Sequence, residues 1–490
     1  MRARLTAGLV VLGATGLWSI AQEGCGSSAK KAPPPPTGSG AFGVVTVNGK
    51  QELFLPVRAL NDAGHGQIAV VDVGVGGSGI NDAGVPAQLA NIDMDILDGG
   101  LIDADGGGGV PTTTAGDATV IIAAGTYTYT VWFIDPTTNR ITDTIQLDPS
   151  LNQASFSGGS GLVNGIAIDE ANHRAILSVW NGLLFVDLGS HKVTGRVLAA
   201  GAENFGYDSS REYVLSPFYD CGATGAVGDE DGGGATSPPC ASYVTLGDAG
   251  VVITDGLNLI NLINNKVYTF ENPDAGSTSQ PLGSSPDSAA VDPSSGLAIV
   301  PAEFSNFYTF IDLSKAVFSF NGDAGIFTAP STTLFPMTSD DGVAVDPASH
   351  LAFCELEFES HVSVIDLTKI STSTMPPDAG LPDAGQGDAG GLPLGVGPGG
   401  FADGMLPNLP DGNEWADLGD PHGIAVTTGI QTGDPVGFVV TDLTAQGLPD
   451  LWVARVDLNL MLSLGTKAGV TLTPEMLAPA LTYLDATRKE

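Results

Sequence analysis

The chain has little positive charge, with 18 Lys and Arg residues against 55 Asp and Glu residues and a formal net charge of −37. Nucleic-acid binding depends on clustered Lys and Arg side chains that neutralise phosphates. The composition therefore excludes nucleic acid as a partner. An acidic surface is also repelled by anionic lipid, so we expect membrane contact only through a lipid anchor. A charge of this size mainly promotes solubility.

Long apolar runs are also scarce. The main one, residues 5–20, follows the basic segment Met1-Arg2-Ala3-Arg4 and ends at a small-x-small site around Ala21. This order predicts a secretory signal peptide over residues 1–24. The run is too short for an ordinary transmembrane helix.

The chain has only four cysteines. Cys25 resembles a bacterial lipoprotein lipidation site, and soluble secretion is the alternative because Gln22 stands where such sites carry an aliphatic residue. Residues 25–41 then read as an anchor and a Pro/Gly/Ser linker. Cys221 and Cys240 predict a disulfide in an exported protein. Cys354 lies in an apolar run and is interpreted as a buried thiol. Covalent c-type haem is excluded because no Cys-x-x-Cys-His segment is present.

The chain is organised around a stretch that occurs twice. Residues 287–315 and 341–369 align without a gap at an offset of 54 residues. Each copy has three short apolar runs, and an Asp-Pro step separates the first two because proline cannot donate to a strand ladder. Short strands with turn residues between them, repeated along a chain, are typical of the blades of a β-propeller.

Weaker copies of the same phrase extend the pattern over most of the chain. We count seven units, at about 43–75, 118–148, 161–198, 202–272, 284–320, 340–372 and 420–463. The sequence therefore predicts an all-β propeller of about seven blades over residues 42–472. Residues 43–57 are expected to pair with the last blade and close the ring. Thr473 and Pro474 predict a short helix in a C-terminal tail, residues 473–490.

Two phrases carry a family resemblance. Residues 131–147, VWFIDPTTNRITDTIQL, and 361–369, HVSVIDLTK, resemble the signature of YVTN-type, YncE-like propellers. The GIAID and GVAVDP phrases resemble blade openings of NHL and SMP-30/gluconolactonase-like propellers. The resemblance implies the architecture, and it leaves the activity open because propellers host many unrelated functions.

The segments between the apolar runs are rich in Gly and Asp. Asp-Ala-Gly occurs eight times, always between apolar runs, and residues 372–419 read as a disordered loop. We interpret these segments as surface insertions. Calcium binding is the alternative, based on residues 93–106 and 229–232. A calcium loop needs an oxygen ligand at its fifth position and Gly at its sixth, where residues 93–106 have Leu97 and Asp98.

The repeat also predicts a ring of polar residues around its axis. Counting back five positions from the end of each opening run gives one polar residue per unit in five units. They are Asn164, Glu203, Asp287, Asp341 and His422. Converging carboxylate, amide and imidazole groups would suit a ligand or a divalent cation such as calcium. The alternative is that each residue caps a turn before its strand.

A second acidic pattern lies near the end of the sixth unit. Glu355, Glu357, Glu359 and His361 alternate, which predicts one face of one strand. We interpret it as a solvated outer strand, with a metal-binding face as the alternative.

These features predict an exported protein of the cell envelope, lipid-anchored or secreted, that acts as a noncatalytic binding or scaffolding module for an envelope or extracellular protein. An enzyme of the propeller lactonase or quinoprotein class, with chemistry at the axis, is one alternative. A structural propeller stabilised by calcium is another.

Overall fold

The computed structural model describes residues 37–38, 43–57, 66–74, 85–94, 120–124, 130–148, 163–179, 182–199, 205–218, 256–270, 282, 286, 288–302, 307–321, 324–334, 340–356, 360–372, 399–409, 424–429, 433–440, 452–468 and 471–489. All of them belong to one compact unit, Pro34–Glu490. The predicted signal peptide, Cys25, Cys221 and Cys240 lie outside the described residues. No helix among the described residues is long and apolar enough to cross a membrane.

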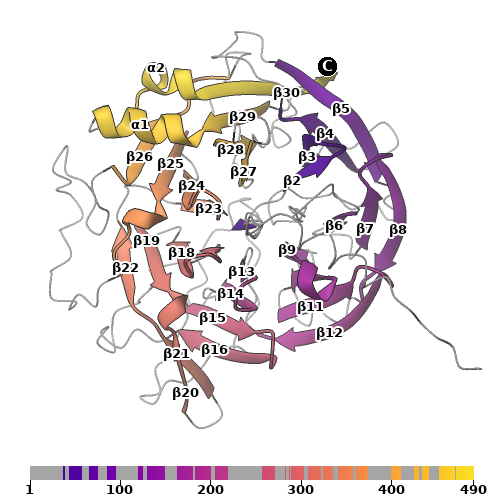
Figure 1. Ribbon diagram of the computed structural model, residues 1–490. Helices are drawn as coiled ribbons and strands as arrows, with labels where there is room; N and C mark the ends of the chain where they lie inside the picture. The colour runs from indigo at the N-terminus through magenta and orange to yellow at the C-terminus, as the bar shows by residue number, and fades with distance from the viewer. Residues whose placement is uncertain are drawn as a thin grey trace, which may run out of the picture. The chain divides into compact units, whose positions relative to one another are not determined.

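The strands form seven antiparallel blades arranged in a ring, which confirms the predicted all-β propeller (Figure 1). Blades 1 to 3 contain β2 (Gly43–Val47), β3 (Lys50–Val57), β4 (Gly66–Asp72) and β5 (Val85–Met94); β6 (Ile121–Ala124), β7 (Thr130–Asp135) and β8 (Arg140–Gln146); and β9 (Val163–Asp169), β10 (Arg174–Val179), β11 (Gly182–Asp187) and β12 (Lys192–Leu198).

Blades 4 to 7 continue the ring. They contain β13 (Gly206–Asp208), β14 (Tyr213–Phe218), β15 (Gly256–Asn261) and β16 (Lys266–Phe270); β17 (Ala290–Asp292), β18 (Leu297–Ala302), β19 (Phe307–Asp312) and β22 (Ser331–Leu334); β23 (Asp340–Asp346), β24 (Leu351–Leu356), β25 (His361–Asp366) and β26 (Phe401–Met405); and β27 (Ile424–Thr428), β28 (Pro435–Val440), β29 (Trp452–Asp457) and β30 (Leu481–Lys489). The first strand of each blade lies nearest the centre of the ring (Figure 1).

The fourth strand of several blades lies beyond the limits that the repeat predicts. β5, β22, β26 and β30 follow the third strand of their blades after insertions in the sequence. β26 falls within residues 372–419, which the sequence predicts as a disordered loop, and Leu406 and Leu409 in the same range are buried. That range is therefore not all loop, because a five-residue strand completes blade 6 by pairing with β25.

The ring closes at its outer edge and not through residues 43–57. β2 pairs with β3, and β3 pairs with β4, all inside blade 1. The closure comes from parallel pairing of β30 with β5, in which Leu484 is opposite Val85. The first and last blades thus share one eight-stranded sheet. The predicted C-terminal tail is correct for α2 (Pro474–Leu477), but the residues after it form the last strand of blade 7.

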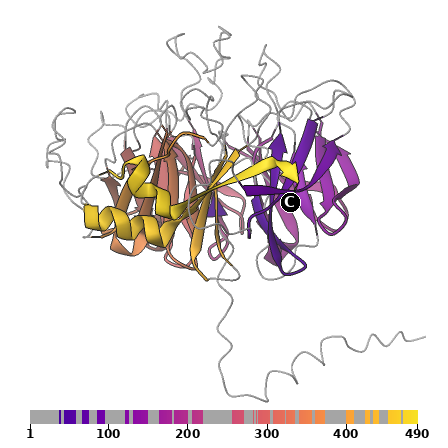
Figure 2. The ribbon, with the colours of Figure 1, turned by 90° about the horizontal axis from the view of Figure 1, so that it is seen from above.

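A helix that the sequence analysis did not predict lies on the outer rim. α1 (Leu458–Ala468) follows β29 directly and begins where the Asp457 carboxylate accepts a hydrogen bond from the Leu460 backbone N–H at 2.9 Å. Figure 2 shows α1 and α2 on the outside of the ring. Gly465 lets α1 approach blade 6, because a Cβ atom there would lie 2.5 Å from the Cβ of Ala402.

One hairpin leaves its own blade and joins the neighbouring one. β20 (Val317–Asn321) and β21 (Ala324–Thr328) lie between β19 and β22 in the sequence, but β21 pairs in parallel with β16 of blade 4. Gly325 permits this approach, since a Cβ atom there would lie 2.4 Å from the Val267 carbonyl oxygen. Part of one Asp-Ala-Gly segment, Ala324-Gly325, is therefore in a strand and not in a loop.

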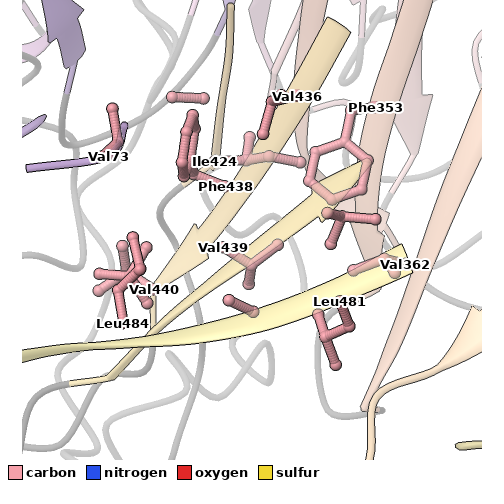
Figure 3. Close-up of a cluster of buried hydrophobic side chains, with 14 of the residues drawn as sticks. Val73, Phe353, Val362, Ile424, Val436, Phe438, Val439, Val440, Leu481 and Leu484 are labelled. Carbon is pink, nitrogen blue, oxygen red and sulfur yellow. The ribbon is translucent and has the colours of Figure 1, made fainter. Parts of the chain in front are cut away.

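The core is divided among the interfaces between neighbouring blades. The largest cluster joins blades 6, 7 and 1 and includes Phe353, Phe438 and Leu484 (Figure 3). The Phe353 ring lies over Gly437 of the next blade, where a Cβ atom would come within 2.5 Å of the ring. Burying one Phe side chain contributes roughly 1.5–3 kcal/mol, so these interfaces hold much of the stability of the ring.

Candidate functional site

Two of the five predicted axial residues lie in described strands. Asn164 is on β9 and Asp341 is on β23, which are the first strands of blades 3 and 6. Both strands line the centre of the ring (Figure 1). Glu203, Asp287 and His422 lie outside the described residues. The structure thus places the backbone of Asn164 and Asp341 on strands that line the centre of the propeller. The ring of five polar residues stays a prediction.

The centre of the ring contains a strand from the start of the chain. β1 (Thr37–Gly38) pairs antiparallel with β23, so that Thr37 is opposite Val345 and Gly38 is opposite Ala344. It also approaches β13, β17 and β27, the first strands of three other blades. Figure 1 shows it as a short indigo strand near the centre. β1 therefore covers the inner edge of blade 6. It lies within residues 25–41, which the sequence predicts only as an anchor and a linker.

The aspartates that end the first strands are buried and hydrogen-bonded. Their exposed fractions are 1% or less, and they are Asp169, Asp208, Asp292 and Asp346. Each accepts hydrogen bonds from the turn that follows it, as Asp346 does from the Ala348 backbone N–H at 3.1 Å and the Ser349 hydroxyl at 2.8 Å. Buried carboxylates need such donors to offset their lost hydration. The Asp of the repeated Asp-Pro phrase thus fixes the turn into the second strand.

Side-chain hydrogen bonds join neighbouring blades, and two of them involve these aspartates. His350 of blade 6 contacts the Asp292 carboxylate of blade 5 through Nδ1 at 2.8 Å. The Thr428 hydroxyl of blade 7 donates to Asp346 of blade 6 at 2.8 Å. Gln51 of blade 1 donates through Nε2 to the Thr427 hydroxyl at 3.1 Å. We call these contacts the interblade chain.

Between blades 4 and 5 the interblade chain uses a backbone carbonyl. The Ser210 hydroxyl, 2.7 Å from Asp208, also lies 2.8 Å from the Pro293 carbonyl oxygen. Arg211 forms an ion pair with Asp208 at 2.8 Å, and its guanidinium lies over Gly296. Gly296 has a φ of +78°, and a Cβ atom there would lie 2.5 Å from the Arg211 guanidinium. The positive φ favours glycine here, while the equivalent position of blade 6 is His350, with a φ of +59°.

The surroundings of Asp292 lower its pKa. Burial alone would raise the pKa of Asp292, but hydrogen bonds from Ser294, His350 and Ser295 outweigh burial and hold the pKa below its ordinary value of 3.8. Asp292 is therefore a stable carboxylate, suited to a structural contact. A general acid would need the opposite shift.

The second aspartate of the repeat has a different task. It ends the third strand, in the Ile-Asp-Leu phrase, and caps the turn that follows. Asp135 accepts from the Thr137 backbone N–H at 2.8 Å, and Asp366 accepts from that of Thr368 at 2.9 Å. Asp side chains favour turns for this reason. Both aspartates of the repeated phrase therefore have structural partners.

The predicted acidic face at Glu355 is wrong in two respects. β24 ends at Leu356 and β25 begins at His361, so the four residues do not share one strand. Glu355 is also 1% exposed, on the second strand of blade 6, and so it does not belong to a solvated outer strand. Glu357 and Glu359 lie outside the described residues. Cys354 is fully buried beside it, as predicted.

A pair of acidic residues lies in blade 1, on the strand face that also carries Phe54 and Val70 and packs against blade 2. Glu52 on β3 is opposite Asp72 on β4, and the two residues are 8% and 7% exposed. Burial raises the pKa of Glu52 to about 7, the charge of Asp72 adds to the increase, and the charge of Lys50 opposes it. Glu52 Oε2 has no hydrogen-bond partner among the described residues. Glu52 therefore binds a proton at a higher pH than an ordinary glutamate does.

Sequence reasoning missed the partners of the repeated aspartates. His350 directly precedes β24 and Gln51 is the second residue of β3, and each also contributes a carbonyl that accepts from the residue after the third strand of its blade. The residue that precedes the second strand of each repeat is the signal that indicates them. Among the described residues there is no cluster of three or more His, Cys, Asp and Glu side chains with metal-binding geometry. Asp93 of the proposed calcium segment lies on β5, opposite Gln67.

Comparisons with known proteins give a likeness of fold at low identity. No protein-family model matches the chain, and no curated protein matches it. A hydrazine synthase structure from Kuenenia stuttgartiensis has a TM-score of 0.44 and 12% identity, covering 88% of this chain and 98% of that chain. A complex of KlAtg21 with the coiled coil of AgAtg16 has a TM-score of 0.44 and 6% identity, covering 85% and 94%. Hsv2 from Kluyveromyces lactis has a TM-score of 0.41 and 7% identity, covering 86% and 93%.

Proposed function

We propose that the protein is an exported propeller of the cell envelope that binds a partner protein without catalysing a reaction. The observation that carries this proposal is the pairing of β1 with the inner edge of β23. Propeller enzymes of the kinds considered above would use the axis for chemistry. In this chain a segment of the protein itself occupies part of the axis, which favours the outer surfaces as the places where a partner binds.

The bonding of the repeated aspartates supports the same proposal. Asp292 and Asp346 are buried, and each is held by its own turn and by the next blade. These carboxylates are therefore engaged in holding the blades together. A lowered pKa at Asp292 suits this role, because the group stays charged and keeps its hydrogen bonds at neutral pH.

The test is chemical cross-linking in intact cells, followed by capture of the mature protein and mass spectrometry. We expect one dominant partner at near-stoichiometric yield, cross-linked to residues outside the axis. A matched measurement applies a panel of lactones to the captured protein and to a variant with Asp287→Asn, Asp341→Asn and His422→Gln. Turnover that this triple variant abolishes, with an unchanged melting temperature, would overturn the proposal in favour of an axial enzyme.

A further inference from the structure

The hairpin of β20 and β21 presents an open sheet edge at the rim of the propeller. It extends the sheet of blade 4 in the order β13, β14, β15, β16, β21, β20. β20 is thus the last strand of a six-stranded sheet. No strand in the described part of the chain pairs with its outer edge. Figure 1 shows β20 and β21 projecting from the ring.

The register of the hairpin indicates which backbone groups face outward. Asn321 is opposite Ala324, with two residues between them in the sequence, and Phe320 is opposite Gly325. A pair that closes a two-residue turn exchanges hydrogen bonds, and hydrogen-bonded pairs then alternate along an antiparallel ladder. The N–H and C=O groups of Phe318 and Phe320 therefore point away from β21, towards the open edge.

The side chains of β20 leave this edge unprotected. Residues 316–322, AVFSFNG, contain no charged side chain in a protein with a net charge of −37. Val317 is 63% exposed and Phe320 is 54% exposed. Natural proteins usually protect an edge strand with charge, proline or a bulge, because an open edge pairs with other chains.

An aromatic cluster holds the hairpin against blade 4. Phe318 packs on Tyr268 with ring centroids 4.7 Å apart and on Tyr213 at 5.8 Å. The Lys266 ammonium lies 4.6 Å from the centroid of the Phe320 ring. Such contacts each stabilise the packing beyond the burial of area. The edge is therefore held in place before any partner binds.

The charge of the protein decides between two occupants. A second copy would pair β20 with β20 but would bring two chains of −37 together. A partner of opposite charge is attracted by the same field, which raises its association rate. An incoming strand would meet no charged side chain on β20, while the partner as a whole approaches a protein with a net charge of −37.

We propose that β20 is a docking edge that adds one extended strand from a partner protein of net positive charge. This inference depends on the proposed binding function and names the surface and the kind of partner. Backbone hydrogen bonds to Phe318 and Phe320 supply the pairing, and alternate side chains of the incoming strand contact Phe320 or Val317.

The experiment selects random nine-residue peptides from a display library on the full mature protein. We expect enriched peptides to alternate β-branched or aromatic residues with polar ones and to carry Lys or Arg without Asp or Glu. Their affinity, measured with synthetic copies, should fall several-fold between 50 and 300 mM salt, since charge steering is screened. Enrichment of acidic peptides, or of none, contradicts the proposal.

Two variants at one position isolate the backbone donor. Phe320→Ala keeps the outward N–H, whereas Phe320→Pro removes it while leaving the hydrogen bonds to β21 in place. We expect Phe320→Pro to bind the selected peptides at least tenfold more weakly than Phe320→Ala, with equal melting temperatures. Equal affinity for the two variants would overturn the proposal.

Two further results separate the alternatives. Sedimentation of the wild-type protein as a dimer that Phe320→Pro returns to monomer would identify a second copy as the occupant and overturn the inference. The second result combines a cellular partner cross-linked at a site away from β20 with selected peptides whose affinity Phe320→Pro does not change. It would refute the docking edge and leave the proposed binding function standing.

Discussion

The acidic pair on β3 and β4 of blade 1 makes the stability of the ring depend on pH. Glu52 is buried opposite Asp72, and its pKa rises from an ordinary 4.5 to about 7. The folded protein therefore holds a proton on Glu52 that the unfolded chain releases above pH 4.5. Stability then falls as the pH rises from 4.5 to 7, because the folded state binds more protons than the unfolded state in this range.

The substitution Glu52→Gln removes the ionisation and keeps the size of the side chain. A shift of about 2.5 pKa units corresponds to about 3 kcal/mol, at 1.36 kcal/mol per unit. We expect Glu52→Gln to stabilise the protein by up to about 3 kcal/mol at pH 8 and by close to zero at pH 4.5.

The assay is urea unfolding of the wild-type protein and the variant at half-unit steps from pH 4.5 to 8.5. Glu475→Gln is the matched control, since Glu475 is exposed and hydrogen bonds from the Glu475 backbone and Thr473 lower its pKa. The control should show the same pH dependence as the wild-type protein over this range. A Glu52→Gln difference that stays constant with pH would refute the reasoning, because it would mean that Glu52 is charged in the folded protein throughout.

Four further predictions concern the contacts between blades. Gly437→Ala should destabilise the protein by roughly 1–3 kcal/mol, because its new methyl group meets the Phe353 ring. Gly189→Ala, on an exposed turn, is the control and should not destabilise it. Urea unfolding midpoints compare the two variants, and equal midpoints would contradict the packing of Gly437 against Phe353. Asp292→Asn and His350→Ala should be coupled by about 1 kcal/mol in a double-mutant cycle at pH 7, and additive effects would remove this contact from the interblade chain. The lowered pKa of Asp292 adds stability that is present above its ordinary pKa and lost as the pH falls through the folded value, so Asp292→Asn should flatten the acid limb of the melting curve. Deleting residues 481–490 removes β30 and leaves the edges of β29 and β5 open, so small-angle scattering should show an expanded or aggregated chain, and an unchanged compact particle would contradict the closure.

The repeated phrases were enough to predict seven blades and the order of three strands in each. This worked because the first three strands lie close together in sequence, with Asp-Pro or Asn-rich turns between them that have a local physical cause. The same aspartates could be assigned to turns but not to partners. The His350 contact with Asp292 spans 58 residues, and no local pattern encodes it.

The fourth strands show where local reasoning fails. β26 and β30 follow insertions, and their sequences alternate too briefly to distinguish a strand from a loop. The hairpin of β20 and β21 pairs with blade 4 although blade 5 surrounds it in sequence, so only the folded neighbours decide its sheet. Glu355 was misplaced because residues 357–360 contain no Gly, Pro or Asn to indicate the turn before His361.

The axis is equally hard to predict from sequence. β1 consists of Thr37 and Gly38 in a segment whose composition indicates a linker, and its partner lies more than 300 residues away. Its position matters most for function, because the proposed noncatalytic role depends on the axis being covered by the chain itself.

A cysteine pair tests the position of β1 directly. Gly38→Cys with Ala344→Cys places two thiols on opposite residues of β1 and β23, at a spacing that cross-strand pairs provide for a disulfide. Gly38→Cys with Ala123→Cys on β6 is the control. We predict that the mature, folded protein forms the 38–344 disulfide in high yield, detected as a linked peptide by mass spectrometry, while the control pair does not. Equal and low yields for both pairs would show that β1 does not hold the centre of the ring, and would contradict the observation that carries the proposed function.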